Sequence, residues 1–150
     1  MDFNLINRLK ESFPSLHQTV SDEDRFLIGQ GAMIGGGDKN DASHLIDKPF
    51  LDTRKDIKAF WVNNQPSNSW TFETVHRPRN PLLYKAPMLL ITEGINKYFR
   101  SVSAISKNDV VYRSSLTALK IHKVEDIKVL SNCSKIINTF MDKCYSSILL

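Results

Sequence analysis

The stretch from Tyr84 to Lys120, YKAPMLLITEGINKYFRSVSAISKNDVVYRSSLTALK, decides the expected fold of this chain. Runs of apolar and β-branched residues within it are divided by proline, glycine and Asn-Asp, which is typical of short strands joined by tight turns. We expect three strands here, at 88–92, at 100–106 and from 110 toward 119. The second alternates polar and apolar residues, as a strand with one buried face does.

Helical periodicity flanks this strand region. Apolar residues recur every three or four positions over residues 2–13, and again from Lys123 toward the C-terminus. We therefore expect an N-terminal amphipathic helix and a C-terminal helix of about twenty residues with a strong core stripe. The stripe includes Cys133 and Cys144. We expect both to be buried, because they lie on the apolar face, and reduced, because about 16 Å of helix separates them, which is too far for a disulfide.

Residues 25–83 contribute further short strands to the expected fold. Strand-like runs occur at 25–28, near Phe50, at 57–62 and at 70–76, with polar turns between them. The sequence predicts an α+β fold, with a mixed, mostly antiparallel sheet or partly open barrel and both helices against it. A chain of 150 residues with 41% hydrophobic residues has the size and composition of a single domain spanning 1–150.

Charge is distributed unevenly along this chain of net charge +4. Residues 1–70 hold 8 basic and 10 acidic residues, whereas residues 71–150 hold 12 basic and 6 acidic ones. A basic half favours polyanionic partners such as nucleic acid, although a solvated surface can carry the same excess. No apolar run reaches the roughly 18 residues of a membrane helix, and the N-terminus is unlike a secretory signal. We expect a cytoplasmic protein without a membrane partner.

Five of the six glycines lie between Gly29 and Gly37. Such clustering favours either a hairpin or bulge with unusual backbone angles, or a loop that closely approaches a macromolecule. Two nucleotide-binding patterns do not fit. The dinucleotide fingerprint would need glycine at Ile34, and the phosphate loop would need lysine at Gly37. The glycines therefore predict no nucleotide cofactor.

No catalytic or metal-binding motif stands out. The four histidines are scattered without ligand spacing, and neither a nucleophile elbow nor a distinguished acid–base pair is present. The loops instead carry arginine, lysine, asparagine and glutamine. These residue types contact phosphates and pair with the edges of purine bases, so they favour nucleic-acid binding.

The order of the segments resembles the target-recognition region of adenine-specific (N-6) DNA methyltransferases from bacterial restriction–modification systems. Members of that family often combine methylation and restriction in one polypeptide. The resemblance covers roughly residues 25–147 and rests on four elements. The first two are the strand and glycine loop at 28–35, and the basic lead-in and strand at 77–94. The other two are the Arg-initiated strand with Val-Val-Tyr-Arg at 100–113, and the helix containing Ile137-Asn138-Thr139 and Tyr145-Ser146-Ser147.

Two motifs of the complete enzymes are missing. The cofactor glycine motif is absent, and Asn80-Pro81-Leu82-Leu83 has leucine where the catalytic tetrapeptide has a second proline and an aromatic residue that stacks on the target base. The resemblance therefore implies a specificity fragment without a cofactor or enzymatic activity of its own. The methyltransferase catalytic domain and its S-adenosylmethionine are expected in the parent protein.

Double-stranded DNA is the partner that the resemblance implies, with two loops in different roles. We expect the segment of Arg77 and Arg79, together with Lys85, to hold phosphates, because its prolines stiffen it. The glycine loop has little side-chain bulk and is expected to approach base edges. The expected DNA-binding residues are Gln30, Met33, Asp38, Lys39, Asn40, Arg77, Arg79, Lys85 and Arg100.

Two other classes of function remain open at this point. In the first, the chain is a protein-interaction module whose basic surface has no nucleic-acid role. In the second, it is a small enzyme with an unrecognised site. Binding to DNA that weakens with salt would distinguish DNA recognition from the interaction module.

Overall fold

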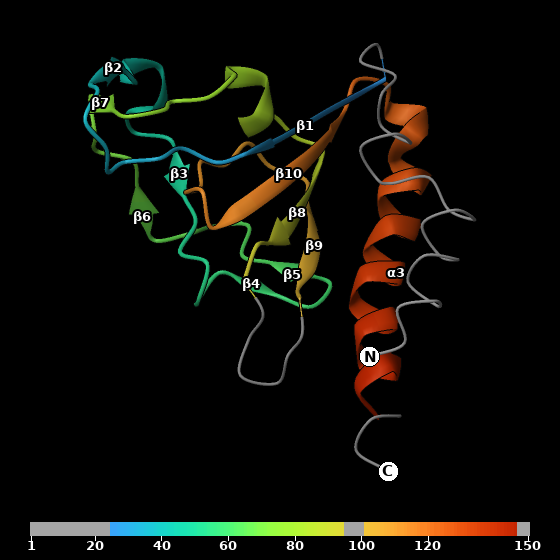
Figure 1. Ribbon diagram of the computed structural model, residues 1–150. Coiled ribbons are helices and arrows are strands. Elements are labelled where there is room, and N and C mark those ends of the chain that lie inside the picture. The colour runs from blue at the N-terminus through green and yellow to red at the C-terminus, as the bar shows by residue number, and fades with distance from the viewer. Residues whose placement is uncertain (1–24, 95–100, 147–150) are drawn as a thin grey trace.

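The computed structural model describes residues 25–94 and 101–146 (Figure 1). Three expectations lie outside this described part of the chain. They are the N-terminal helix at 2–13, a DNA-binding role for Arg100, and the burial of Cys144, whose side chain is not described.

A four-stranded antiparallel sheet forms the centre of the fold. Its strands lie in the order β1 (Phe26–Gln30), β10 (Leu116–Ile121), β8 (Met88–Thr92) and β9 (Ser103–Ser106). The register places Gln30 opposite Thr117 and Leu116 opposite Thr92. Because the strands alternate in direction, the end of β1, the start of β10 and the end of β8 meet at one end of the sheet.

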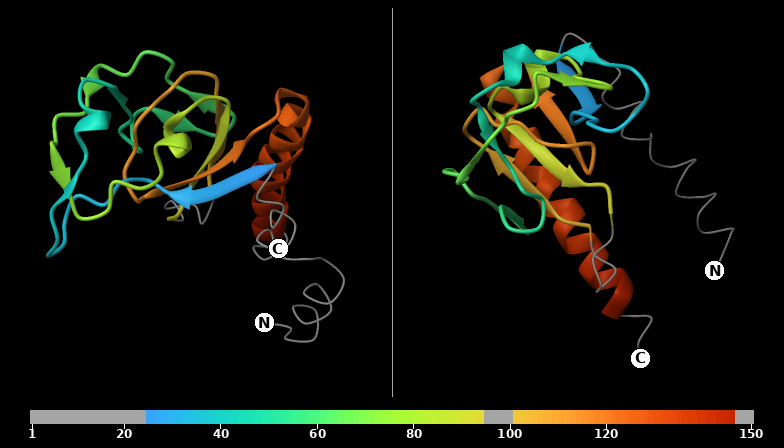
Figure 2. Two further views of the ribbon diagram at one scale, coloured as in Figure 1. Left: turned by 90° about the horizontal axis from the view of Figure 1, so that it is seen from above. Right: turned by 90° about the vertical axis from the view of Figure 1, so that its left-hand side faces the viewer.

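Three short antiparallel ladders lie beside this sheet. They pair β2 (Asn40–Asp41) with β7 (Thr74–Val75), β3 (Pro49–Phe50) with β6 (Asn68–Ser69), and β4 (Ile57–Lys58) with β5 (Trp61–Val62). The connections include three 3-10 helices, η1 (Ser43–Leu45), η2 (Pro81–Tyr84) and η3 (Val124–Asp126). Figure 2 shows these ladders on one side of the central sheet and the C-terminal helix on the other.

The predicted partly open barrel and mixed sheet are wrong. The named strands form separate antiparallel sheets, in which β1 and β9 are the edges of the largest. The remaining strands are two residues long, which is too short to extend that sheet into a barrel. The single strand expected at 57–62 is a hairpin instead, and 70–76 forms a strand only at Thr74–Val75. The described chain is mostly sheet with one α-helix.

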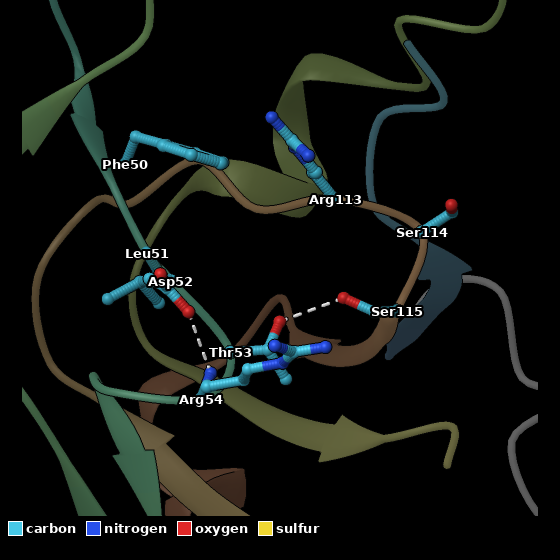
Figure 3. Close-up of a pocket in the computed structure, with 8 residues that line it drawn as sticks. All are labelled: Phe50, Leu51, Asp52, Thr53, Arg54, Arg113, Ser114 and Ser115. Carbon is cyan, nitrogen blue, oxygen red and sulfur yellow. Dashed lines mark hydrogen bonds between the residues drawn. The ribbon is translucent and has the colours of Figure 1, made fainter. Parts of the chain in front are cut away.

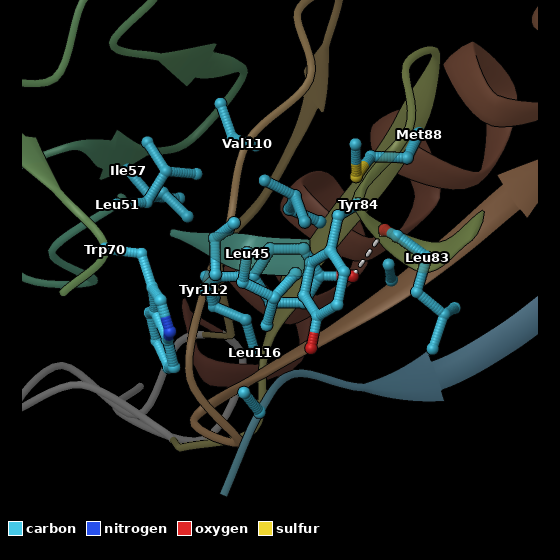
Figure 4. Packing of buried hydrophobic residues seen from close by; sticks show 14 of the residues in the cluster. Leu45, Leu51, Ile57, Trp70, Leu83, Tyr84, Met88, Val110, Tyr112 and Leu116 are labelled. Atoms are coloured by element: carbon cyan, nitrogen blue, oxygen red, sulfur yellow. Dashed lines mark hydrogen bonds between the residues drawn. The ribbon is translucent and has the colours of Figure 1, made fainter. Parts of the chain in front are cut away.

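The central sheet has an apolar layer on each face. Along β8, Met88 and Leu90 point into a large core with Trp70 and Tyr112, while Leu89 points to the opposite face. Figure 4 shows this large core, which the ladders and η2 enclose. Because Met88, Leu89 and Leu90 are buried on both faces of the sheet, β8 begins with a continuous apolar run in the sequence.

The C-terminal helix α3 (Ile127–Ser146) confirms the predicted helix and covers the second face of the sheet. Leu130 is buried there, and Cys133 is half-buried against the same cluster. Burial raises the pKa of the Cys133 thiol above its usual value. Within the described residues, no helix combines the length and apolar character needed to cross a membrane.

Candidate functional site

Loops from distant parts of the sequence meet at the end of the sheet where β1 and β8 finish and β10 begins. Ala32 forms a parallel bridge with Arg113, and Met33 forms an antiparallel bridge with Arg77. The backbone N–H of Glu93 donates to the carbonyl oxygen of Ser115 at 3.0 Å. These bonds join the glycine loop, the basic segment, the β8 exit and the turn before β10 into one surface.

The glycine loop and the basic segment are paired directly, although the sequence suggested two separate loops. Met33 and Arg77 exchange backbone hydrogen bonds of 3.0 and 3.1 Å. A side chain at Gly31 would overlap the carbonyl oxygens of Tyr112 and Arg113, and Gly36 has a φ of 147° against the ring of His76. Close packing within the protein therefore explains two of the glycines.

A hydrogen-bonded network runs through Gln30 at the centre of this surface. Arg79 Nη2 donates to Gln30 Oε1 at 2.9 Å, and Gln30 Nε2 donates to Glu93 Oε2 at 2.8 Å. The hydroxyl of Thr117 donates to the other oxygen of Glu93. Gln30 and Arg79 are half-buried, so the network fixes a guanidinium and an amide at the surface.

Hydrogen bonds from two buried tyrosines hold the backbone around Arg79. Arg79 has a φ of 69°, a left-handed conformation that is costly for a residue with a side chain. The hydroxyl of Tyr84 donates to the carbonyl oxygen of Pro78 at 2.8 Å, and that of Tyr112 donates to Leu83 at 2.8 Å. Burial raises the pKa of both phenols far above the usual value, so they act as neutral donors.

The far end of the glycine loop is exposed and more loosely tied. Asn40 Nδ2 donates to the carbonyl oxygen of His76 at 2.6 Å, and Asp38 lies 3.5 Å from His76 Nδ1. Lys39 is exposed, and its ammonium has no ion-pair partner among the described residues. The structure thus brings Met33, Arg77 and Arg79 together with Gln30 where the two loops are paired. Asp38, Lys39 and Asn40 lie farther along the glycine loop, where Asp38 and Asn40 contact His76.

Lys85 does not belong to this group. It precedes the start of β8, at the end of the sheet away from Glu93. Its ammonium forms a 2.7 Å ion pair with Asp109, which also accepts a bond of 2.8 Å from the backbone N–H of Ala86. Partial burial acts to raise the pKa of Asp109, but these bonds outweigh it and the pKa lies below its usual value.

A hollow that the sequence did not reveal adjoins this surface (Figure 3). It has a volume of about 580 Å³ and is lined by residues of the 50–54 stretch and the 113–115 turn. Arg113 belongs to the Val-Val-Tyr-Arg run of the sequence, but no sequence motif singled out Arg54, the other arginine of the hollow. Only the folded chain brings these two arginines to one cavity.

Within residues 25–94 and 101–146, no group of three or more histidine, cysteine, aspartate or glutamate residues has an arrangement suited to a metal ion. Searches of protein-family models, curated proteins and solved structures give no match to this chain.

Proposed function

We propose that this chain recognises specific sequences in duplex DNA, as the specificity part of an adenine-specific DNA methyltransferase or restriction–modification enzyme. The observation that carries the proposal is the pairing of the glycine loop with the basic segment through Met33 and Arg77. This pairing presents phosphate-binding and base-reading side chain types together on one surface. The excess of basic residues in the second half of the chain supports the same partner.

Arg77 and Lys39 are the residues best suited to phosphate contacts. Both are exposed, and neither cation has an ion-pair partner among the described residues. Cations that are not paired within the protein would position a duplex without reading its sequence. Lys85, whose charge is already paired with Asp109, would contribute less than these two.

Gln30 and Arg79 are the residues best suited to read base edges, so in this proposal Arg79 has a base-reading role in place of the phosphate contact expected from the sequence. The bonds from Arg79 to Gln30 and from Gln30 to Glu93 fix both side chains before any ligand arrives. Arg79 uses Nε and Nη2 within the protein, which leaves N–H groups of its guanidinium for a guanine edge. Such fixed donors lose little conformational entropy on binding.

The methyl-transfer chemistry in this proposal belongs to a catalytic domain of the parent protein, which uses S-adenosylmethionine. The chain described here supplies the choice of sequence. Its place of action would be the cytoplasm of a bacterial cell, where the target DNA lies.

A salt titration tests the proposal. Binding of the chain to a fluorescent duplex is followed by anisotropy at several salt concentrations. We expect weak binding that falls steeply with salt, and Arg77→Ala or Lys39→Ala should each reduce the slope of log K against log salt by about one. Lys107→Ala is the matched control, because Lys107 is exposed at the far end of β9. Absence of binding at low salt would refute the proposal.

A role in protein interaction is a second candidate, favoured by the β4–β5 hairpin. Phe60 and Trp61 at its turn are 57% and 46% exposed. Phe60 has a φ of 64°, and its backbone N–H donates to Ser103 at 3.0 Å. A fixed, exposed aromatic pair is a common feature of protein interfaces.

Binding to the methyltransferase domain of the parent protein would test this second role. The double variant Phe60→Ser, Trp61→Ser should weaken that association and leave affinity for DNA unchanged. Unchanged association would exclude the hairpin as a docking point.

A further inference from the structure

The hollow beside the paired loops has the size and the lining of a small-ligand site. Its volume of about 580 Å³ lies within the roughly 300–1,000 Å³ of such sites. Two guanidinium groups, three hydroxyl groups, one carboxylate and one aromatic ring line it. The lining residues are Phe50, Leu51, Asp52, Thr53, Arg54, Arg113, Ser114 and Ser115.

The two walls of this hollow are tied together, so its shape is preformed. The N–H of Leu51 donates to Val111 at 2.9 Å, and the N–H of Val111 donates to Pro49 at 2.8 Å. The hydroxyls of Thr53 and Ser115, one from each wall, lie 2.8 Å apart in an exposed hydrogen bond. A ligand would therefore enter a site that requires little rearrangement.

Arg113 is oriented without using its hydrogen-bond donors. Its guanidinium carbon lies 5.5 Å from the centre of the Phe50 ring, and that ring packs edge-on against Trp70 at 5.3 Å. A guanidinium stacked on an aromatic face keeps its N–H groups directed outward in its own plane. Figure 3 shows Arg113 and Phe50 side by side at one end of the hollow.

Arg54 supplies the second cation. Its backbone N–H donates to Asp52 Oδ1 at 2.9 Å, which shapes the turn that carries it. Its guanidinium has no ion-pair partner among the described residues, and the side chain is exposed. Asp52 contributes the single carboxylate of the lining, so the two arginines leave the hollow with an excess of one positive charge.

The hydroxyl groups complete a set of donors. In the Thr53–Ser115 pair one hydroxyl donates to the other, and the accepting hydroxyl keeps its proton for a third group. Guanidinium and hydroxyl donors line this hollow, and they are the groups that bind the oxygens of a phosphate, which accepts several charge-assisted bonds at once.

We propose that this hollow binds a phosphate group, held between the guanidiniums of Arg54 and Arg113. In the DNA complex this phosphate would belong to the backbone close to the bases read by Gln30. Hydrogen bonds connect Ser115 to Glu93 and Glu93 to Gln30, so the hollow lies near that residue. This second step rests on the proposed function. A free phosphate-containing small molecule is the other source of the same chemistry.

Titration with inorganic phosphate tests the hollow independently of DNA. Amide resonances of Thr53, Ser114 and Ser115 are followed by NMR in the 150-residue chain. We expect saturable shifts at these amides, and Arg113→Gln or Arg54→Gln should weaken binding about tenfold, the equivalent of one lost charge-assisted bond. Lys55→Gln is the matched control, because it removes an exposed charge next to Arg54 without touching the lining. Equal shifts in wild type and both arginine variants would overturn the proposal.

A duplex of fixed sequence distinguishes the two sources. If the backbone is the ligand, Arg113→Gln should lower affinity for all sequences alike and reduce the salt slope by about one. If phosphate binds in the hollow but Arg113→Gln leaves duplex affinity unchanged, the source is a small molecule and the backbone assignment is wrong. If phosphate binds in the hollow and no variant or wild type binds DNA, the proposed function fails while the phosphate site stands.

Discussion

Replacing Asn138 by alanine should undo the attachment of α3 to the edge of the central sheet. Asn138 is 7% exposed, and Ser103 on β9 is completely buried. The side-chain amide of Asn138 contacts both backbone groups of Ser103, accepting from its N–H at 2.9 Å and donating to its carbonyl oxygen at 2.7 Å. That carbonyl oxygen also accepts from the backbone N–H of Phe60 at 3.0 Å. The same amide nitrogen donates to Ser134 Oγ at 3.3 Å. No other contact joins helix and edge strand by two backbone bonds in the described residues.

The cost follows mainly from the buried N–H of Ser103, which is left without a partner, because the carbonyl oxygen of Ser103 keeps its hydrogen bond from Phe60. Each buried backbone group that loses its partner costs about 1–3 kcal/mol. Alanine has a better helix propensity than asparagine, which returns up to about 0.7 kcal/mol. We therefore expect Asn138→Ala to lower the free energy of unfolding by about 1–3 kcal/mol, equivalent to a decrease in Tm of roughly 2–12 °C for a chain of this size.

Urea unfolding followed by circular dichroism measures this change. The matched control is Asn132→Ala, the same substitution at an exposed position of α3, which should alter stability by less than about 0.7 kcal/mol. If Asn138→Ala changes the free energy of unfolding by an amount within about 0.5 kcal/mol of the change for Asn132→Ala, the side-chain amide of Asn138 does not hold the helix to β9.

Three further outcomes are expected. Tyr84→Phe should cost about 1–2 kcal/mol, because the carbonyl oxygen of Pro78 loses its buried donor; unchanged urea unfolding would refute this. Asp109→Asn should destabilise the protein at neutral pH, because the pKa of Asp109 is lowered in the folded state. The stabilisation is present above about pH 4 and is lost as the pH falls through the lowered pKa. A difference in unfolding free energy between variant and wild type that stays constant into acid would contradict this. Incubation with labelled S-adenosylmethionine and DNA should give no methyladenine, and label incorporation by the purified chain would overturn its assignment as a specificity fragment.

Long, strongly patterned segments were predictable from the sequence. The strand β8 has the predicted bounds 88–92, because a continuous apolar run bounded by Pro87 and Glu93-Gly94 can hardly form anything but a buried strand. The helix α3 follows from its apolar spacing. The barrel was not a sound prediction, because the sequence does not reveal which strands pair, and the two edges of the sheet do not meet.

Turns that depend on distant contacts were not predictable. The hairpin at 57–62 turns at Ala59 and Phe60, which are not residues that favour a turn. Phe60 has a φ of 64°, and in this conformation its backbone N–H donates to the carbonyl oxygen of Ser103, which lies far along the chain. Local propensity would extend this segment as a single strand, so tertiary contacts decide its conformation.

The candidate site was partly predictable. Residue type and loop position singled out Gln30, Arg77 and Arg79, which lie together in the structure. The role of Glu93 in fixing Gln30, and the meeting of Arg54 with Arg113, depend on pairings between segments far apart in the sequence. Lys85 shared their basic character but has its own partner in Asp109.

Selection from a pool of randomised duplexes is the most direct test of sequence-specific recognition. Wild-type chain should enrich one short sequence, and Gln30→Ala should lose preference at one base pair of it, worth about 1–3 kcal/mol, while Arg77→Ala weakens binding to all sequences alike. Retention of the pool without any enriched sequence, with the two variants indistinguishable, would contradict recognition by the paired loops.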